Sequence, residues 1–210
     1  MTKRLHKLEE EGFLISRVSP RVNATVYLLD KKGGRHAADL LGREVSNVWS
    51  HCPKDADIFH DLMVAGLIRI VVDAVEEKRG YEIDFFLLEH CMKATTRPRK
   101  NLCYPDFKIG IVTPAGPKTY DVEVDCGTIS RRDFLSKMNS FENVTLIVSN
   151  TLARMTLLCK YAARLYRNKT VYANTFEKVK KEGFFTGKWF LAKGNCWEYL
   201  CREVEHLEKH

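Results

Sequence analysis

The spacing of apolar residues predicts a helix, a hairpin and a second helix in the first fifty residues. Leu5 and Leu8 mark the apolar side of a short basic helix. Two β-prone runs follow, and the Ser-Pro-Arg-Val-Asn segment between them predicts a hairpin with a basic turn. The expected elements are a helix that ends at Gly12, strands at 13–18 and 24–29, and a helix near 32–41 that stops at Gly42.

Beyond residue 50 the pattern predicts an α/β domain. Apolar residues recur every three or four positions from 55 to 77, as in a long amphipathic helix, and after Gly80 the period changes to two. The later elements are strands at 81–88, 107–112 and 119–125, a helix at 130–140, a strand at 144–149, a helix at 152–166 and a last core strand at 170–173. This order predicts a mixed β-sheet flanked by helices on both faces.

The C-terminal part carries clustered aromatic residues and cysteines. We expect Phe184-Phe185 and Trp189-Phe190 to pack in the core, with a stacking platform for single strands as the alternative. Cys196 and Cys201 are expected in a C-terminal helix with buried thiols. They form no CxxC pair, so the spacing does not favour a zinc site.

The order helix, basic-tipped hairpin, helix is typical of the end of a winged helix-turn-helix module. In such a module the first helix lies in the major groove of DNA and the hairpin is the wing. The helices that normally precede it are absent, so residues 1–50 would be a partial or degenerate winged helix and residues 51–210 the α/β domain. The alternative is a helix and hairpin that cap another domain.

Composition favours a soluble protein with a polyanionic partner. The chain has 210 residues, a formal net charge of +7 and 45% hydrophobic residues, and no apolar run is long enough to span a bilayer. Seven cysteines, an odd number, indicate reduced thiols in a cytoplasmic protein. Double-stranded DNA is the expected partner. The candidate DNA-binding cations, which solvated loop charge would also explain, are Lys3, Arg4, Lys7, Arg21, Arg97, Arg99, Lys100, Arg131 and Arg132.

Four carboxylates between these basic clusters are the candidate catalytic groups. Asp106 begins one strand of a predicted hairpin, and Asp121, Glu123 and Asp125 alternate along the other, so they share one face. Oxygen ligands of this kind suit Mg²⁺ or Mn²⁺, which can activate water for attack on a phosphodiester. The alternative is that the three alternating acids form the solvated face of a half-exposed strand.

Pro105-Asp106 followed by Glu123-x-Asp125 resembles the motif of the PD-(D/E)xK restriction-endonuclease-like superfamily. With the winged-helix pattern ahead of it, the Glu-Val-Asp-Cys-Gly-Thr run from Glu123, and Lys137 on the next helix, roughly residues 1–180 resemble the replication-relaxation proteins of plasmids and mobile elements. The resemblance implies that Asp106 and Glu123 hold a metal ion. Asp125 stands where the superfamily has its lysine, and is expected as an auxiliary ligand. Lys137 could supply a migrated amine.

Two functions remain open at this point. The first is a DNA-binding protein of a mobile element, active in DNA replication or relaxation, that nicks or cleaves DNA with Mg²⁺ or Mn²⁺. The second is a catalytically inactive regulator or replication accessory factor that clamps DNA or forms a homodimer. Asp125 in the lysine position favours the second, whereas the presence of both Asp106 and Glu123 favours the first. An RNA-binding protein is a third class, which only the charge supports.

Overall fold

The computed structural model describes residues 2–20, 23–45, 55–95, 103–127, 129–165 and 169–200. The chain divides into two compact units, Met1–Asp61 and Leu62–His210, each described by itself below. Helix α4 (Asp55–Glu76) crosses the boundary between them. Within the described ranges, no helix combines the length and the hydropathy needed to cross a bilayer.

The first unit has the predicted order of helix, hairpin and helix. Its elements are α1 (Thr2–Glu10), β1 (Leu14–Ser19), β2 (Ala24–Leu29) and α2 (Lys31–Leu41). The two strands pair antiparallel in continuous register. Gly42 ends α2 in the left-handed conformation (φ 60°), as the sequence predicted.

Two close contacts fix the helices of this unit to the hairpin. The Glu9 carboxylate of α1 accepts hydrogen bonds from the backbone N–H and the hydroxyl of Ser16, at 3.0 and 2.5 Å. At the start of α2, a Cβ on Gly33 would lie 2.0 Å from the carbonyl oxygen of Phe13. Only glycine allows the two backbones to approach in this way.

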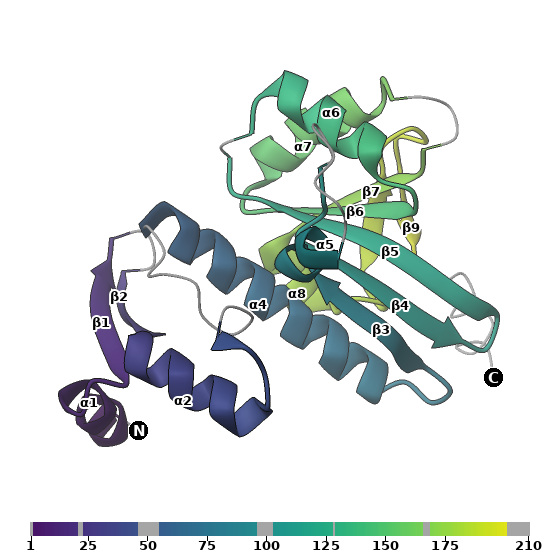
Figure 1. The fold of residues 1–210 in the computed structure, drawn as a ribbon. Helices are drawn as coiled ribbons and strands as arrows, with labels where there is room; N and C mark the ends of the chain where they lie inside the picture. Colours follow the sequence, from purple (N-terminus) through teal and green to yellow (C-terminus); the bar gives the residue numbers. More distant parts are fainter. Residues whose placement is uncertain are drawn as a thin grey trace. The chain divides into compact units, whose positions relative to one another are not determined.

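The second unit is built on one seven-stranded mixed sheet (Figure 1). Its strands are β3 (Glu82–Leu88), β4 (Phe107–Thr113), β5 (Gly116–Asp125), β6 (Val144–Ser149), β7 (Val171–Thr175), β8 (Lys188–Leu191) and β9 (Cys196–Tyr199). They lie side by side in chain order. The β5–β6 and β6–β7 pairs are parallel, and the other neighbours are antiparallel. The predicted mixed sheet is therefore confirmed.

Helices flank this sheet. Besides α4 they are α5 (Glu89–Thr95), α6 (Arg131–Ser140), α7 (Leu152–Ala162) and α8 (Phe176–Glu182). The parallel crossovers run through α6 and α7, which lie together over one face of the sheet (Figure 1). Phe134 of α6 and Leu158 of α7 share a buried cluster with Ile147 of β6 on that face. On α4, a Cβ added at Gly66 would touch the Phe176 ring of α8.

Several sequence predictions near the C-terminus were wrong. Cys196 lies in strand β9 and not in a helix, and β7 is followed by two further strands. The short helices α5 and α8 were not predicted either. The aromatic residues Phe184, Phe185 and Trp189 are buried, as expected of core residues, so they are not a stacking platform.

Leu157 and Leu158 are adjacent on α7 and provide a matched test of this core. Leu158 is fully buried, whereas the side chain of Leu157 is 37% exposed. We expect Leu158→Ala to lower the free energy of unfolding by about 3 kcal/mol, because it leaves a cavity in the cluster under α6 and α7. Leu157→Ala should cost less than about 1 kcal/mol. Urea denaturation of both variants checks this, and equal losses would contradict the packing of α7 described here.

Candidate active site

Strand register brings the predicted acids together on one face of the sheet. Phe107 pairs with Val122, so Asp106 lies opposite Glu123 at the end of the β4–β5 hairpin. Asp121, Glu123 and Asp125 alternate along β5 and point toward α6 and α7. All four carboxylates are buried: Asp106 is 8% exposed and the three on β5 are 5% or less. The alternative interpretation, a solvated face of a half-exposed strand, is therefore wrong.

Lys137 joins Asp106 and Glu123. Ser130 caps α6 by accepting a hydrogen bond from the backbone N–H of Asp133, and the helix then carries Lys137 over the hairpin end. Its Nζ lies 2.6 Å from Oε1 of Glu123 and 4.0 Å from Oδ1 of Asp106. The other oxygen of Asp106 accepts a 2.6 Å hydrogen bond from the backbone N–H of Val124, which fixes its carboxylate.

Electrostatics keep Lys137 positively charged. Burial by itself favours the neutral amine and lowers the pKa of Lys137. The negative charges of Glu123, Asp106 and Glu89, together with the hydrogen bond to Glu123, outweigh burial, so the pKa of Lys137 is raised above its ordinary value. At neutral pH the residue is a fixed cation, suited to offset negative charge on a ligand and unsuited to accept a proton.

Asp125, the third predicted metal ligand, is held by a different cation. Arg154 of α7 donates from Nε and Nη2 to the two carboxylate oxygens of Asp125, at 3.0 and 2.7 Å. The backbone N–H of Gly127 donates to the same carboxylate at 2.5 Å, and Arg154 also donates to the carbonyl of Ile129 at 2.8 Å. These bonds tie the end of β5 to the chain that enters α6. Sequence reasoning did not identify Arg154, because only the fold brings α7 beside β5.

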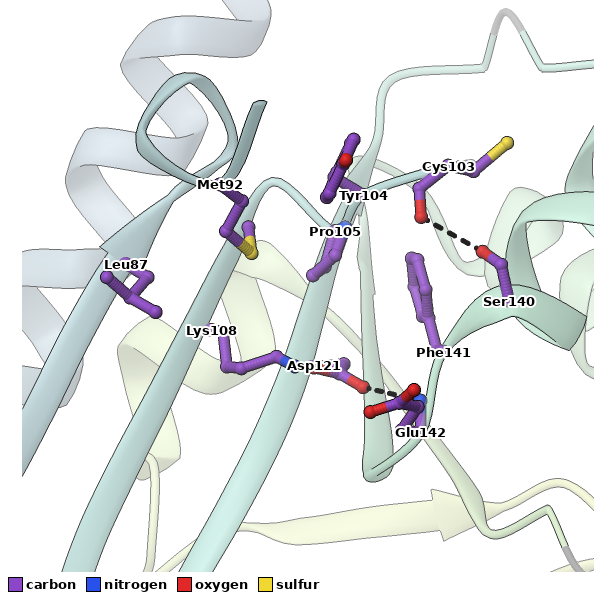
Figure 2. Close-up of a pocket in the computed structure, with 10 residues that line it drawn as sticks. All are labelled: Leu87, Met92, Cys103, Tyr104, Pro105, Lys108, Asp121, Ser140, Phe141 and Glu142. Carbon is purple, nitrogen blue, oxygen red and sulfur yellow. Dashed lines mark hydrogen bonds and ion pairs between the residues drawn. The ribbon is translucent and has the colours of Figure 1, made fainter. Parts of the chain in front are cut away.

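Asp121 has a structural role at the other end of the row. Its carboxylate accepts hydrogen bonds from the backbone N–H groups of Glu142 and Asn143, at 3.1 and 2.9 Å, and so holds the chain that leaves α6. Lys108 of β4 lies 3.4 Å from it. Lys108 and Asp121 also line a pocket of about 290 Å³ next to Pro105-Asp106 (Figure 2). Its walls include Met92, Tyr104 and Phe141, so the site has adjacent space for an apolar or planar group.

Glu89 is a further acid close to this group. It begins α5, and its backbone N–H donates to the carbonyl of Asp106 at 3.0 Å. Its side chain forms a 2.8 Å ion pair with Lys93, and its charge contributes to the raised pKa of Lys137. In the sequence, Glu89 is marked only by its place at the end of the strand predicted at 81–88.

The candidate DNA-binding cations that the structure describes are exposed. Lys3, Arg4 and Lys7 lie on α1 of the first unit. Arg131 and Arg132 form the first turn of α6, the helix that carries Lys137. Arg21, Arg97, Arg99 and Lys100 lie outside the described residues.

The carboxylates of Asp106 and Glu123 fit a site in which a hard divalent cation has two protein ligands. One carboxylate oxygen of Asp106 and one of Glu123 lie within 4.0 Å of the Lys137 ammonium, so the two carboxylates are close neighbours. Mg²⁺ in phosphoryl-transfer sites is commonly bound through one or two carboxylates, the remaining ligands being waters and substrate phosphates. Among the described residues no group of three or more His, Cys, Asp or Glu side chains is arranged to hold a metal ion. In the part of the chain that the structure describes, a metal ion at this site would therefore have two carboxylate ligands, those of Asp106 and Glu123.

Comparison with known proteins adds no further assignment to this geometry. No protein-family model, no curated protein and no solved structure matches the chain. The function is therefore inferred from the side chains of the site and from the resemblance in the sequence.

The contribution of the Arg154–Asp125 ion pair to folding can be tested by measuring the free energy of unfolding. Replacing Arg154 by Met leaves a carboxylate that is 3% exposed without its bidentate partner, and we expect a loss of about 3 kcal/mol in the free energy of unfolding. The double variant Arg154→Met/Asp125→Asn removes the buried charge and should recover most of that loss. Urea denaturation measures both. A loss below about 1 kcal/mol for Arg154→Met, or no recovery in the double variant, would contradict the role of the pair.

Proposed function

We propose that the second unit is a divalent-metal-dependent phosphodiesterase that nicks or cleaves DNA. The observation that carries the proposal is the convergence of Asp106, Glu123 and Lys137. Asp106 immediately precedes β4, Glu123 lies on β5 and Lys137 on α6, and Lys137 lies within ion-pair distance of both acids. Two carboxylates can hold a metal ion that assists attack on a phosphodiester, and an amine beside them can offset negative charge in the transition state.

The order of elements supports this proposal. From α4 to β6 the chain forms a helix, three antiparallel strands with the short helix α5 between the first and second, a crossover helix and a parallel strand. Apart from α5, this order is similar to the core of the PD-(D/E)xK superfamily that the sequence resembles. The lysine would then come from α6, since Asp125 stands in the strand position and is bound to Arg154. A setting in the replication of a mobile element rests on the sequence resemblance alone.

Each residue has a distinct role in this proposal. Asp106 and Glu123 would hold the ion, with Asp106 oriented by the backbone of Val124. When bound there, Mg²⁺ or Mn²⁺ supplies Lewis acidity toward a phosphoryl oxygen and lowers the pKa of a bound water. Lys137 offsets the negative charge that grows on the phosphoryl oxygens in the transition state. Arg131 and Arg132, exposed one turn or more before Lys137 on the same helix, are available to pair with backbone phosphates.

Nicking of a supercoiled plasmid with Mg²⁺ or Mn²⁺ tests the proposal. Asp106→Asn and Glu123→Gln should abolish nicking, and Lys137→Met should slow it by about 100-fold or more, the usual effect of removing one group that stabilises transition-state charge. Glu82→Gln, which neutralises an exposed acid on β3, should leave the rate unchanged. Metal-dependent nicking that survives in Asp106→Asn and Glu123→Gln would overturn the assignment of the site.

Metal binding can be measured separately from cleavage. An ion that binds only the folded protein raises its unfolding temperature in proportion to the logarithm of its concentration. We expect Mn²⁺ to raise the unfolding temperature of the wild type and of Lys137→Met, but not of Asp106→Asn/Glu123→Gln. A rise of equal size in all three proteins would place the ion elsewhere.

A second function, DNA binding without cleavage, is favoured by one observation. The 2.6 Å ion pair between Lys137 and Glu123 can serve as a permanent neutralising contact in place of a metal ion. This function predicts salt-dependent binding of duplex DNA with no nicking in either metal. It also predicts that Mn²⁺ does not change the unfolding temperature of the wild type.

A further inference from the structure

Trp197 is an exposed aromatic residue on the edge strand of the sheet. Its side chain is 40% exposed, in contrast to the fully buried Trp189 on the neighbouring strand. Lys178 of α8 places its ammonium 3.4 Å from the centre of the Trp197 ring, and Phe190 meets the ring edge-on at 5.4 Å. Tyr199, two residues further on the same strand, has Lys188 above its ring at 5.2 Å. Two rings of β9, the exposed Trp197 and the half-buried Tyr199, are therefore each covered by a lysine, one from α8 and one from β8.

Trp197 lines two hollows in the surface. One, of about 520 Å³, lies between α8 and the β8–β9 hairpin and includes Lys178, Lys188 and Tyr199. The other, of about 450 Å³, lies along α7 and includes Lys160 and Lys193. Both volumes fall within the range of about 300–1,000 Å³ that is usual for ligand sites.

The two linings are strongly positive. Together they contain four lysines, Lys160, Lys178, Lys188 and Lys193, and one carboxylate, Glu182. A ligand that stacks on the aromatic rings and also pairs with the lysine ammonium groups must have both planar groups and several negative charges. Single-stranded nucleic acid has both, because its unpaired bases are free to stack on aromatic rings while its phosphates pair with lysines. Duplex DNA keeps the faces of its bases covered by stacking on one another.

We propose that the surface formed by Lys178, Lys188, Trp197 and Tyr199 binds single-stranded DNA, with a base taking the place of the Lys178 ammonium on the Trp197 ring and adjacent phosphates paired with Lys178 and Lys188. The surface is separate from the candidate active site. β9 lies four strands from β5 in the sheet, which at ~4.8 Å per strand is roughly 19 Å. The proposal stands independently of whether the active site cleaves DNA.

Fluorescence anisotropy with a labelled 12-nucleotide oligothymidylate tests this surface, using the full chain in EDTA at low salt so that no metal-dependent cleavage occurs. We expect Trp197→Leu to weaken binding by on the order of 10-fold, within the range for loss of one base–aromatic stack. Trp197→Phe, which keeps an aromatic face, should retain most of the affinity. Lys178→Gln/Lys188→Gln should make the dependence of log K on log salt shallower by about 1.4, since each phosphate contact on a single strand contributes roughly 0.7.

Lys180→Gln/Lys181→Gln is the matched control. It removes two charges from the same helix at exposed positions that line neither hollow, so the salt dependence should stay within about 0.3 of the wild-type slope. Unfolding temperatures show whether Trp197→Leu is folded. If it is not, the affinity of Trp197→Phe and the salt dependence of Lys178→Gln/Lys188→Gln decide the outcome. Absence of binding by the wild type, a loss of affinity for a 12-base-pair duplex in a folded Trp197→Leu variant as large as its loss for oligothymidylate, or equal slopes for the two lysine pairs would each overturn the proposal.

Discussion

Four carboxylates are buried on one face of the β4–β5 hairpin, and the helices on that face supply most of the groups that make their burial tolerable. An uncompensated carboxylate in such a place costs several kcal/mol. Arg154 of α7 binds Asp125, Lys137 of α6 binds Glu123 and approaches Asp106, and Lys108 with the backbone after α6 binds Asp121. The same contacts therefore place α6 and α7 on the sheet and determine which acids remain near each other. Asp125 and Asp121 become parts of the framework, while Asp106 and Glu123 share one lysine.

The lysine shared by Asp106 and Glu123 distinguishes this candidate catalytic group from the structural ion pair of Arg154 and Asp125. Arg154 meets Asp125 as a fork against a carboxylate, the geometry of a stable structural pair. Lys137 is a point charge between two acids at unequal distances, with a raised pKa that keeps it a cation. A lysine in that position can form a new ion pair with an incoming phosphate. Its ammonium is a point charge on a flexible side chain, whereas the planar guanidinium of an arginine is held by two parallel hydrogen bonds. The basic first turn of α6 adds cations on the helix that carries it.

Two chemically different groups of side chains lie along the sheet, and we propose that both act on nucleic acid. Near β4 and β5 the buried Asp106 and Glu123 share Lys137, and we assign this group to chemistry on a phosphodiester. Near β8 and β9 lysines lie over the exposed Trp197 ring and the half-buried Tyr199 ring, and we assign this group to unpaired bases. An enzyme or accessory factor that works on DNA with single-stranded regions would use both. The first unit, with Lys3, Arg4 and Lys7 exposed on α1 ahead of a hairpin, carries a third set of cations.

Sequence alone determined the element order of the first unit and the succession of strands β3 to β7 along the chain, from alternation in β3 to β5 and from a continuous apolar run in β6. It also determined that Asp121, Glu123 and Asp125 share a face, since alternation along a strand is a local property. β8 and β9 were missed because four-residue strands have almost no period, although Gly194-Asn195 between two aromatic runs was a hairpin signal. Only the tertiary structure decided that the acids are buried, that Lys137 reaches Asp106 and Glu123 while Arg154 binds Asp125, and that Trp197 is exposed. Those outcomes depend on which helix packs over which strand, and packing joins residues whose separation along the chain carries no information about their distance in space.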